Sequence, residues 1–295
     1  MLRDKAFCKS SERLAYVNMQ HRQSLPLEFW GLERWPFGGT VAAGQFYPTA
    51  GHNEALARIE YLVEGRRRLG ALLGESGVGK SLVLRVAAEQ LARKGCAVVV
   101  VDTLGATTRE VLWHVACGLR TAPRADADVS WLWRQIVDRV AENRMQQMAT
   151  VVLVDDAGQA GPDLMTQFAR LARLDTTPAA RWTIVLAAEP EQAVRWSETL
   201  RNAVDLRIEL SAWTAEDTVG YVQTALVEAG RLEPVFEEDA LRVLDELSGG
   251  VPRQVERLAD YALLAGAAAR VDTISSAMIE AAYDEIAWPA AVATY

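Results

Sequence analysis

The sequence predicts an α/β fold, in which a parallel sheet lies between two layers of helices and is followed by a small all-helical domain. Three observations lead to this prediction. Short apolar runs alternate with helical patterns between about residues 51 and 210, which is the order that a parallel sheet requires. A glycine-rich loop lies between the first apolar run and the next helical pattern. After Ser211 the apolar runs stop, and four helical patterns follow.

The expected elements of the sheet follow one another in a regular order. A helix is expected over residues 53–68, because Leu56, Ile59 and Leu62 fall on one helical face. The expected strands are 69–73, 96–101, 151–154, 182–187 and 206–210. The expected helices between them are 81–93, 107–119, 130–147, 163–174 and 191–202. The run 96–101 is wholly apolar and rich in valine, so we expect this strand to be buried on both faces.

These patterns divide the chain into three parts: an N-terminal extension (1–50), the core (51–210) and a helical lid domain (211–295). The lid helices are expected at 215–229, 237–247, 252–268 and 275–283, with Thr214 and Ser275 at N-cap positions. A short helix is expected over 14–23 in the extension. The extension is also rich in aromatic residues, which are Phe29, Trp30, Trp35, Phe37, Phe46 and Tyr47. We expect them to pack a loop onto a domain, with stacking of nucleobases as the alternative.

Composition is that of a globular protein with one sizeable core and a smaller companion domain. Cys8, Cys96 and Cys117 are widely spaced and form no metal-binding pattern, so buried thiols in a reducing compartment are expected. No apolar run approaches the roughly 20 residues needed to cross a bilayer, and Met1–Ser10 lacks the hydrophobic stretch of a signal peptide. We therefore expect a cytoplasmic protein without a membrane span.

The charge is unevenly distributed along the chain. The net charge is −8, and residues 51–210 carry 20 basic and 20 acidic side chains. Residues 211–295 carry 5 basic against 15 acidic side chains, so the excess acid lies in the lid domain. This segment is expected to repel a nucleic-acid backbone rather than to hold it.

The glycine-rich loop Gly74–Ser81 reads GESGVGKS and matches the phosphate-binding pattern GxxxxGK[ST] in full. Its glycines let backbone N–H groups approach phosphate oxygens, and the helix that begins near Lys80 directs its positive end to the same phosphates. Lys80 is expected to reach the β- and γ-phosphates, and the Ser81 hydroxyl to ligate magnesium. The sequence therefore predicts a P-loop NTPase that binds and hydrolyses ATP with Mg2+. The expected nucleotide contacts in this loop are Gly74, Glu75, Ser76, Gly77, Val78, Gly79, Lys80, Ser81 and Leu82.

Two carboxylates follow the apolar run 151–154. Asp155, at the strand end, is expected to hold the magnesium ion directly or through water. Asp156 is the expected catalytic carboxylate, which orients the attacking water. An aspartate is one methylene shorter than a glutamate, and a misplacement of ~1 Å can cost about a hundredfold in rate. Hydrolysis is therefore expected to be slow unless the backbone compensates.

Four further residues are candidates for the site. Glu189 follows the strand 182–187 and is expected to sense the γ-phosphate; the alternative is a helix-start residue before Pro190. Arg201 and Arg207 flank the end of the preceding helix and the last strand, where an arginine can enter the neighbouring subunit's site. The alternative for both is a solvated surface arginine. Arg253, in the GVPR sequence at 250–253, is expected to fold back onto the γ-phosphate of its own subunit.

His52 and Asn53 precede the first core helix, where the chain can wrap around the adenine. The two residues are therefore expected in the nucleotide site. For Asn53 an alternative is equally good, because asparagine is a favoured N-cap of a helix.

Together these features resemble the AAA+ superfamily, and more closely the general secretion pathway ATPases of the ExeA type, in the group that includes transposition ATPases of the TniB and MuB type. The resemblance covers about residues 27–285 and is carried by the stretches 29–37, 52–58, 74–81, 155–159, 189–191 and 250–253. It implies ATP-dependent assembly with hydrolysis at subunit interfaces. It also implies the roles given above for Lys80, Ser81, Asp155, Asp156, Arg201 and Arg253.

The sequence departs from this family pattern in three ways. Asp156 replaces the usual glutamate, and Glu189 stands where the family tends to have glutamine. The membrane span and the extracytoplasmic wall-binding domain of the secretion members are missing from the sequence. The last difference weakens the expectation of a role in secretion.

Three functions follow from these features. The first is a cytoplasmic ATPase whose nucleotide state drives assembly with itself, as a homo-oligomer, and regulates a protein partner. The second is a transposition regulator that forms ATP-dependent filaments on DNA, which needs a basic surface. Arg66–Arg68 could contribute to such a surface, and the favoured alternative for this triplet is a solvated helix end. The third is a switch that binds ATP and scarcely hydrolyses it, as the short side chain of Asp156 permits.

Overall fold

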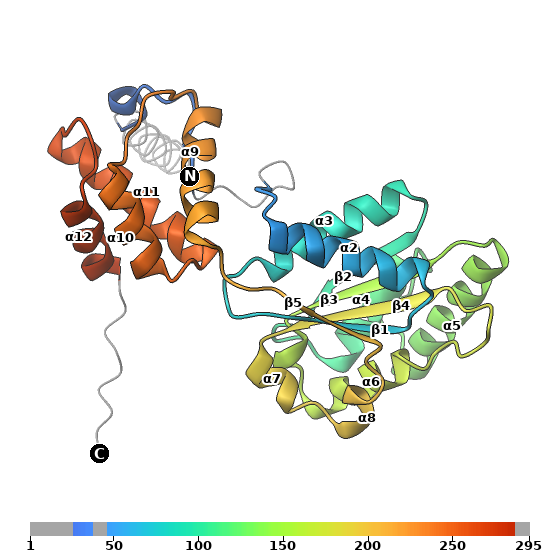
Figure 1. Cartoon of the computed structure of the whole chain (residues 1–295). Coiled ribbons are helices and arrows are strands. Elements are labelled where there is room, and N and C mark those ends of the chain that lie inside the picture. Colours follow the sequence, from blue (N-terminus) through green and yellow to red (C-terminus); the bar gives the residue numbers. More distant parts are fainter. Residues whose placement is uncertain (1–25, 38–45, 287–295) are drawn as a thin grey trace, which may run out of the picture. The chain divides into compact units, whose positions relative to one another are not determined.

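The computed structural model describes residues 26–37 and 46–286 (Figure 1). The chain forms two compact units. The core unit comprises Val41–Ser211, and the helical unit combines Met1–Thr40 with Ala212–Tyr295. The helix expected at 14–23 and the thiol of Cys8 lie outside the described residues.

The core unit is built on a five-stranded sheet in the order β2-β3-β4-β1-β5. All neighbouring strands pair in parallel, which confirms the predicted parallel sheet. β1 lies between β4 and β5, and each of its five residues is buried. The strands are β1 (Leu69–Leu73), β2 (Ala97–Asp102), β3 (Thr150–Asp155), β4 (Trp182–Ala188) and β5 (Leu206–Glu209).

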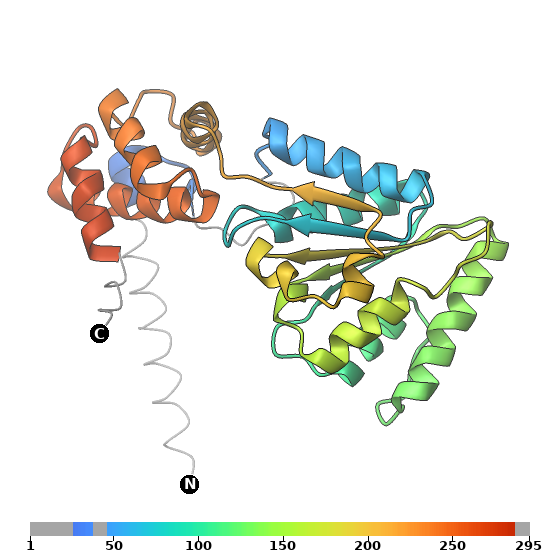
Figure 2. The ribbon, with the colours of Figure 1, turned by 60° about the horizontal axis from the view of Figure 1, so that its bottom comes forward.

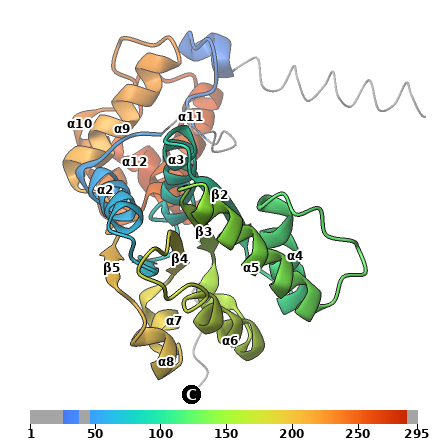
Figure 3. The same ribbon diagram turned by 90° about the vertical axis from the view of Figure 1, so that its right-hand side faces the viewer.

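Helices cover both faces of this sheet (Figure 2). One face packs against α2 (Ala50–Glu64) and α3 (Lys80–Arg93). The other packs against α4 (Thr108–Gly118), α5 (Val129–Met145) and α6 (Pro162–Leu171), and α4 lies beside α5 (Figure 3). Alternate residues of β3 enter the two cores, because successive side chains of a strand point to opposite faces. Val152 belongs to the α4–α6 core and Leu153 to the α2–α3 core.

The prediction that the strand 96–101 is buried on both faces is wrong. β2 forms one edge of the sheet, and only Val99 and Val101 have buried side chains. The side chain of Val100, between them, is 44% exposed. An apolar run shows that a strand enters the sheet, but the position of the strand in the sheet decides whether both faces are covered.

Two helix boundaries also differ from the expectation. The first helix begins at Ala50 and not at Asn53, because the Thr49 hydroxyl accepts a hydrogen bond from the His52 N–H and so caps α2. The N-cap alternative for Asn53 is therefore wrong. The helix expected at 191–202 is divided into α7 (Pro190–Val194) and α8 (Glu198–Arg201). Ser197 separates them, and its hydroxyl caps α8 by accepting from the Leu200 N–H at 3.3 Å.

The helical unit has its own apolar core. Thr214 caps its first helix, where the Thr214 hydroxyl accepts from the Asp217 N–H and the Asp217 carboxylate accepts from the Thr214 N–H. This arrangement confirms the predicted cap. Ser275 directly precedes the last helix of the unit. The helices are α9 (Ala215–Glu228), α10 (Glu238–Ser248), α11 (Pro252–Ala269) and α12 (Ser276–Ile286).

The aromatic segment near the N-terminus packs into this helical core. Residues 26–30 are helical, and the side chains of Trp30 and Phe37 are buried among apolar residues of α9–α12. The Trp30 indole donates to the Leu263 carbonyl at 2.9 Å, and the Trp35 indole donates to Asp260. For Trp30, Trp35 and Phe37 the expected packing of a loop onto a domain is thus confirmed.

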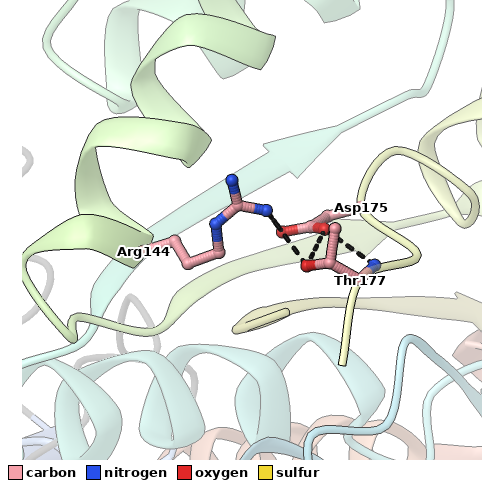
Figure 4. A network of polar contacts seen from close by, with 3 residues as sticks. All are labelled: Arg144, Asp175 and Thr177. Carbon is pink, nitrogen blue, oxygen red and sulfur yellow. Dashed lines mark hydrogen bonds and ion pairs between the residues drawn. The ribbon is translucent and has the colours of Figure 1, made fainter. Parts of the chain in front are cut away.

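A network of polar contacts joins Arg144, near the end of α5, to Asp175 and Thr177 in the loop that follows α6 (Figure 4). The Asp175 side chain is 6% exposed and lies 2.9 Å from the Arg144 guanidinium. Asp175 also accepts hydrogen bonds from the Thr177 N–H at 3.1 Å and the Thr177 hydroxyl at 2.8 Å. This carboxylate therefore satisfies three donors in the core unit.

We expect Asp175→Ala to destabilise the protein by about 1–3 kcal/mol, because it leaves partly buried donors without an acceptor. Urea unfolding followed by circular dichroism measures this change. The matched control is Glu89→Ala, which removes an exposed partner of Arg93 and is expected to cost less than about 1 kcal/mol. Equal losses in the two variants would contradict the importance of the network.

Candidate functional site

Three segments singled out in the sequence meet at one edge of the core sheet. The glycine-rich loop follows β1, Asp155 ends β3 and Glu189 follows β4. β4 lies between β1 and β3 in the sheet. Because the strands are parallel, their carboxyl ends lie at the same edge, which is where open α/β sheets bind ligands.

The glycine-rich loop presents the amino end of α3. Gly79 is the N-cap of this helix, with φ of 103°, and no side chain of the described residues caps it. Gly77 also has a positive φ of 86°. The first N–H groups of a helix have no partner within the helix and carry partial positive charge, so this end suits a phosphate group.

Lys80 is buried and its ammonium lies over the loop. Its Nζ donates to the carbonyl oxygens of Gly74 at 2.8 Å and Glu75 at 2.9 Å. Burial lowers the pKa of Lys80, and the nearby carboxylates of Glu189 and Asp156 oppose this shift. The lysine is thus surrounded by oxygen acceptors at the place where phosphate oxygens would lie.

The carboxylate pair lies beside Lys80. Asp155 is the last residue of β3 and is paired in register with Asp102 of β2. Asp156 follows in a left-handed conformation, with φ of 53°, and begins the short 3-10 helix η2 (Ala157–Gln159). Burial raises the pKa of Asp156, and the charges of Asp155 and Asp102 raise it further. The site therefore holds several carboxylates close to one lysine.

Glu189 begins α7, and its N–H donates to the Gln192 side chain at 3.4 Å. The predicted helix-start role is thus confirmed. Its carboxylate is also one of the nearby negative charges that favour the protonated form of Lys80 and so oppose the lowering of its pKa by burial. Glu189 therefore belongs to the same electrostatic cluster, and sensing of a phosphate stays a prediction.

His52 packs against the phosphate loop. Its side chain is 2% exposed, and Nδ1 lies 2.9 Å from the Thr49 hydroxyl. The imidazole meets the ring of Phe46 edge-on, with 5.5 Å between the ring centroids. A Cβ added to Gly79 would lie 2.9 Å from Nε2 of His52. This contact supports the loop, while contact of His52 or Asn53 with an adenine stays a prediction.

The three candidate arginines lie on elements other than the glycine-rich loop and the strand that carries the carboxylate pair. Arg201 ends α8 and is exposed. Arg207, on β5, is exposed and pairs with Glu209 at 3.0 Å. Arg253 lies in the first turn of α11, in the helical unit. Among the described residues, no hydrogen bond or ion pair joins Arg201 or Arg207 to the glycine-rich loop or to the carboxylate pair.

The sequence did not single out Thr103, which follows β2 and is 2% exposed. Its hydroxyl lies 3.0 Å from the Asp155 carbonyl oxygen and 2.9 Å from that of Asp156. The sequence does contain a signal for this residue, because the apolar run of β2 ends in Asp102-Thr103 and so brings polar side chains to the same edge of the sheet. The sequence alone does not show that β2 pairs with β3, and this pairing is what brings Thr103 to the carboxylate pair.

The donor set of the site fits a nucleotide with a divalent cation. The Ser81 hydroxyl and the Asp155 carboxylate are hard oxygen ligands, which suit Mg2+ bound together with phosphate oxygens.

In the described part of the chain, no helix is both long enough and apolar enough to cross a membrane.

Comparison with known proteins shows a similarity to AAA domains. Residues 63–195 match the family described as AAA domain. Among solved structures, Cdc6p from Pyrobaculum aerophilum is 17% identical, with a TM-score of 0.66. The match covers 84% of this chain and 72% of the Cdc6p chain. The Orc1 protein of Aeropyrum pernix, solved with DNA, is 17% identical with a TM-score of 0.62, covering 83% and 67%. At such low identity these structures show the fold alone, which is that of AAA+ P-loop proteins.

One relative with a similar sequence is the general secretion pathway protein A of Aeromonas hydrophila. It is 30% identical over 242 residues, which are 81% of this chain and 44% of the relative. The AAA domain match and this relative support an AAA+ protein of the general secretion pathway protein A type, as the motifs of the sequence indicated. The chain spans less than half of that relative's length.

We expect Gly79→Ala to destabilise the protein more than Gly95→Ala, which follows the other end of the same helix. Both glycines have positive φ, so an alanine costs about 1 kcal/mol of strain at either position. At Gly95 a Cβ meets nothing within 4 Å, whereas at Gly79 it meets His52. Crowding is expected to add about 1–3 kcal/mol. Thermal unfolding compares the variants, and equal losses would contradict the contact with His52.

Proposed function

We propose that the chain binds ATP with Mg2+ at the carboxyl edge of its core sheet and hydrolyses it to ADP and phosphate. The arrangement of Lys80 supports this proposal best. Its ammonium lies over the glycine-rich loop, beside the uncapped end of α3 and facing the Asp155–Asp156 pair. Loop, helix end, lysine and carboxylates are the parts that phosphoryl transfer from a nucleotide requires.

Each residue of the loop has a role in this proposal. Lys80 exchanges the carbonyl oxygens of Gly74 and Glu75 for β- and γ-phosphate oxygens. Backbone N–H groups between Gly74 and Leu82 bind the remaining phosphate oxygens. The Ser81 hydroxyl and the Asp155 carboxylate hold Mg2+, which neutralises charge on the phosphates.

Asp156 is the proposed catalytic carboxylate. It orients a water molecule, whose oxygen forms a bond to the γ-phosphorus while the bond from that phosphorus to the bridging oxygen breaks. ADP leaves with the bonding electron pair, and the carboxylate accepts the water proton. Glu189 is proposed to sense the γ-phosphate through Lys80, because its carboxylate and the phosphate both interact electrostatically with the ammonium.

The remaining contacts complete the nucleotide site. His52 and Asn53, near the start of α2, are proposed to border the adenine. Arg253 is proposed to reach the γ-phosphate from the helical unit of the same chain. Arg201 is proposed to act on the neighbouring subunit's site, since Arg207 already pairs with Glu209 whereas Arg201 makes no ion pair with any described residue.

We further propose that nucleotide-dependent assembly of this chain, with itself and with a protein partner in the cytoplasm, is the process that hydrolysis serves. The relationship to general secretion pathway protein A supports this proposal, although the chain corresponds to only part of that protein. A switch that binds ATP and hydrolyses it slowly is compatible with the same site, because Asp156 is shorter than a glutamate.

DNA binding is a second candidate. Arg66, Arg67 and Arg68 are all exposed and form no ion pair with the residues that the structure describes. They are available to a phosphate backbone in that part of the molecule, although the acidic helical unit opposes such binding. Binding of duplex DNA that requires ATP and weakens steeply with salt would favour this function over partner regulation.

We expect Lys80→Ala to weaken binding of Mg-ATP by about 100-fold or more, because it removes a direct partner of the phosphates. Isothermal titration calorimetry on the intact protein measures the affinity. The control is Lys94→Ala at the other end of α3, where the lysine pairs with Glu60, and its affinity is expected to stay within about 2-fold of native. Unchanged affinity in Lys80→Ala would remove the site assignment.

We expect Arg201→Ala to lower turnover by about 10-fold or more while the affinity for Mg-ATP stays within about 2-fold, because the guanidinium acts on transition-state charge in another subunit. Steady-state phosphate release measures turnover. Native turnover per subunit should rise with protein concentration, and mixing Arg201→Ala with Lys80→Ala should restore part of it. Arg207→Ala is the control. Turnover that does not depend on concentration would contradict hydrolysis at an interface.

A further inference from the structure

Thr103 joins the end of β2 to the carboxylate pair at the end of β3. Its hydroxyl lies 3.0 Å from the carbonyl oxygen of Asp155 and 2.9 Å from that of Asp156. Its backbone N–H donates to the Asp155 carbonyl at 3.2 Å. The residue is fully enclosed, so water does not compete effectively for these bonds. One side chain thus contacts the backbone of both carboxylate residues.

The backbone that Thr103 contacts is strained. Asp156 has φ of 53° and ψ of 29°, a left-handed conformation that costs a non-glycine residue about 1 kcal/mol. The Asp156 carbonyl accepts one hydrogen bond from Thr103 and another from the Gln159 N–H at 3.0 Å. Two donors from different elements therefore fix this carbonyl, and with it the direction in which the Asp156 side chain leaves the backbone.

Charge repulsion makes this restraint more important. Asp155 precedes Asp156 in the chain and is paired in register with Asp102, so three carboxylates lie close together at this edge of the sheet. Like charges push the Asp156 carboxylate away from its neighbours, so its position is not fixed by attraction alone. Lys80 is the neighbouring cation that draws it toward the phosphate loop. A backbone restraint is a way to hold the carboxylate against the repulsion.

We propose that Thr103 is a positioning residue for ATP hydrolysis, which holds Asp156 in the geometry that orients the attacking water. The inference rests on the proposed function of Asp156. A short carboxylate tolerates little displacement, since a shift of ~1 Å can cost about a hundredfold in rate. The restraint acts on the step at the γ-phosphate, because Thr103 contacts the backbone carbonyl of Asp155 and not the carboxylate proposed to hold Mg2+.

The test uses the full chain and two substitutions of nearly equal size. Thr103→Val keeps the shape of the side chain but removes the donor, whereas Thr103→Ser keeps the donor. We expect Thr103→Val to lower kcat by about 10-fold to 100-fold, as for a carboxylate displaced by less than ~1 Å. The Kd for Mg-ATP should stay within about 2-fold of native, and Thr103→Ser should keep kcat within about 3-fold of native. A purely structural role would change stability without separating kcat from Kd.

A double-mutant cycle shows whether Thr103 acts through Asp156. Asp156→Asn alone should abolish most turnover, and adding Thr103→Val to it should cause no further loss of kcat, because the residue to be positioned is already removed. Thr103→Ala is a second donor-free variant in case the valine does not fold. Amide hydrogen exchange at Gln159 adds a direct readout, and it should be faster in the donor-free variants than in Thr103→Ser.

The outcomes separate this inference from the function on which it rests. Native-like turnover in Asp156→Asn, or no turnover in the native protein, would contradict the proposed role of Asp156 and the inference with it. Turnover that depends on Asp156 but is unchanged in Thr103→Val would overturn the inference alone. A parallel fall of kcat and of nucleotide affinity in Thr103→Val would also overturn it.

Discussion

The parallel pairing of β1, β3 and β4 is the constraint on which the candidate site depends. Because these strands run in one direction and lie side by side, the segments that follow them must emerge at the same edge of the sheet. The glycine-rich loop, the Asp155–Asp156 pair and Glu189 are far apart in the sequence and meet only for this reason. The helices on both faces bury the central strands β1, β3 and β4 and so hold that edge in a fixed geometry.

The chemistry of the candidate site follows from the close approach of one ammonium group and several carboxylates, which are partly buried at this edge of the sheet. Lys80 is buried, which by itself disfavours its charge, and the surrounding carboxylates compensate. Burial raises the pKa of Asp156, and repulsion by the carboxylates of Asp155 and Asp102 raises it further. Such a cluster keeps its geometry only if the backbone is restrained. The left-handed conformation of Asp156, the hydrogen bonds from Thr103 and the packing of His52 against Gly79 are the restraints that the structure contains.

The helical unit adds a second body with its own core. The segment around Trp30, which precedes the core unit in the sequence, is buried among α9–α12, so the chain enters the helical unit, leaves it for the sheet and returns to it after Ser211. Arg253 begins the helix α11 in this unit. The similarity to AAA+ proteins is the reason for the functions proposed for Arg253 and Arg201.

The sequence by itself determined the order of strands and helices, the phosphate loop and the carboxylates after β3, because hydrophobic periodicity and glycine-rich spacing are local properties of the chain. The tertiary structure alone decided which strand lies at an edge, as the exposed Val100 of β2 shows, and that Thr49 rather than Asn53 caps α2. It also decided which polar side chain holds the Asp156 backbone. These features depend on neighbours that are distant in sequence, and a pattern within one segment carries no information about what the fold brings beside it.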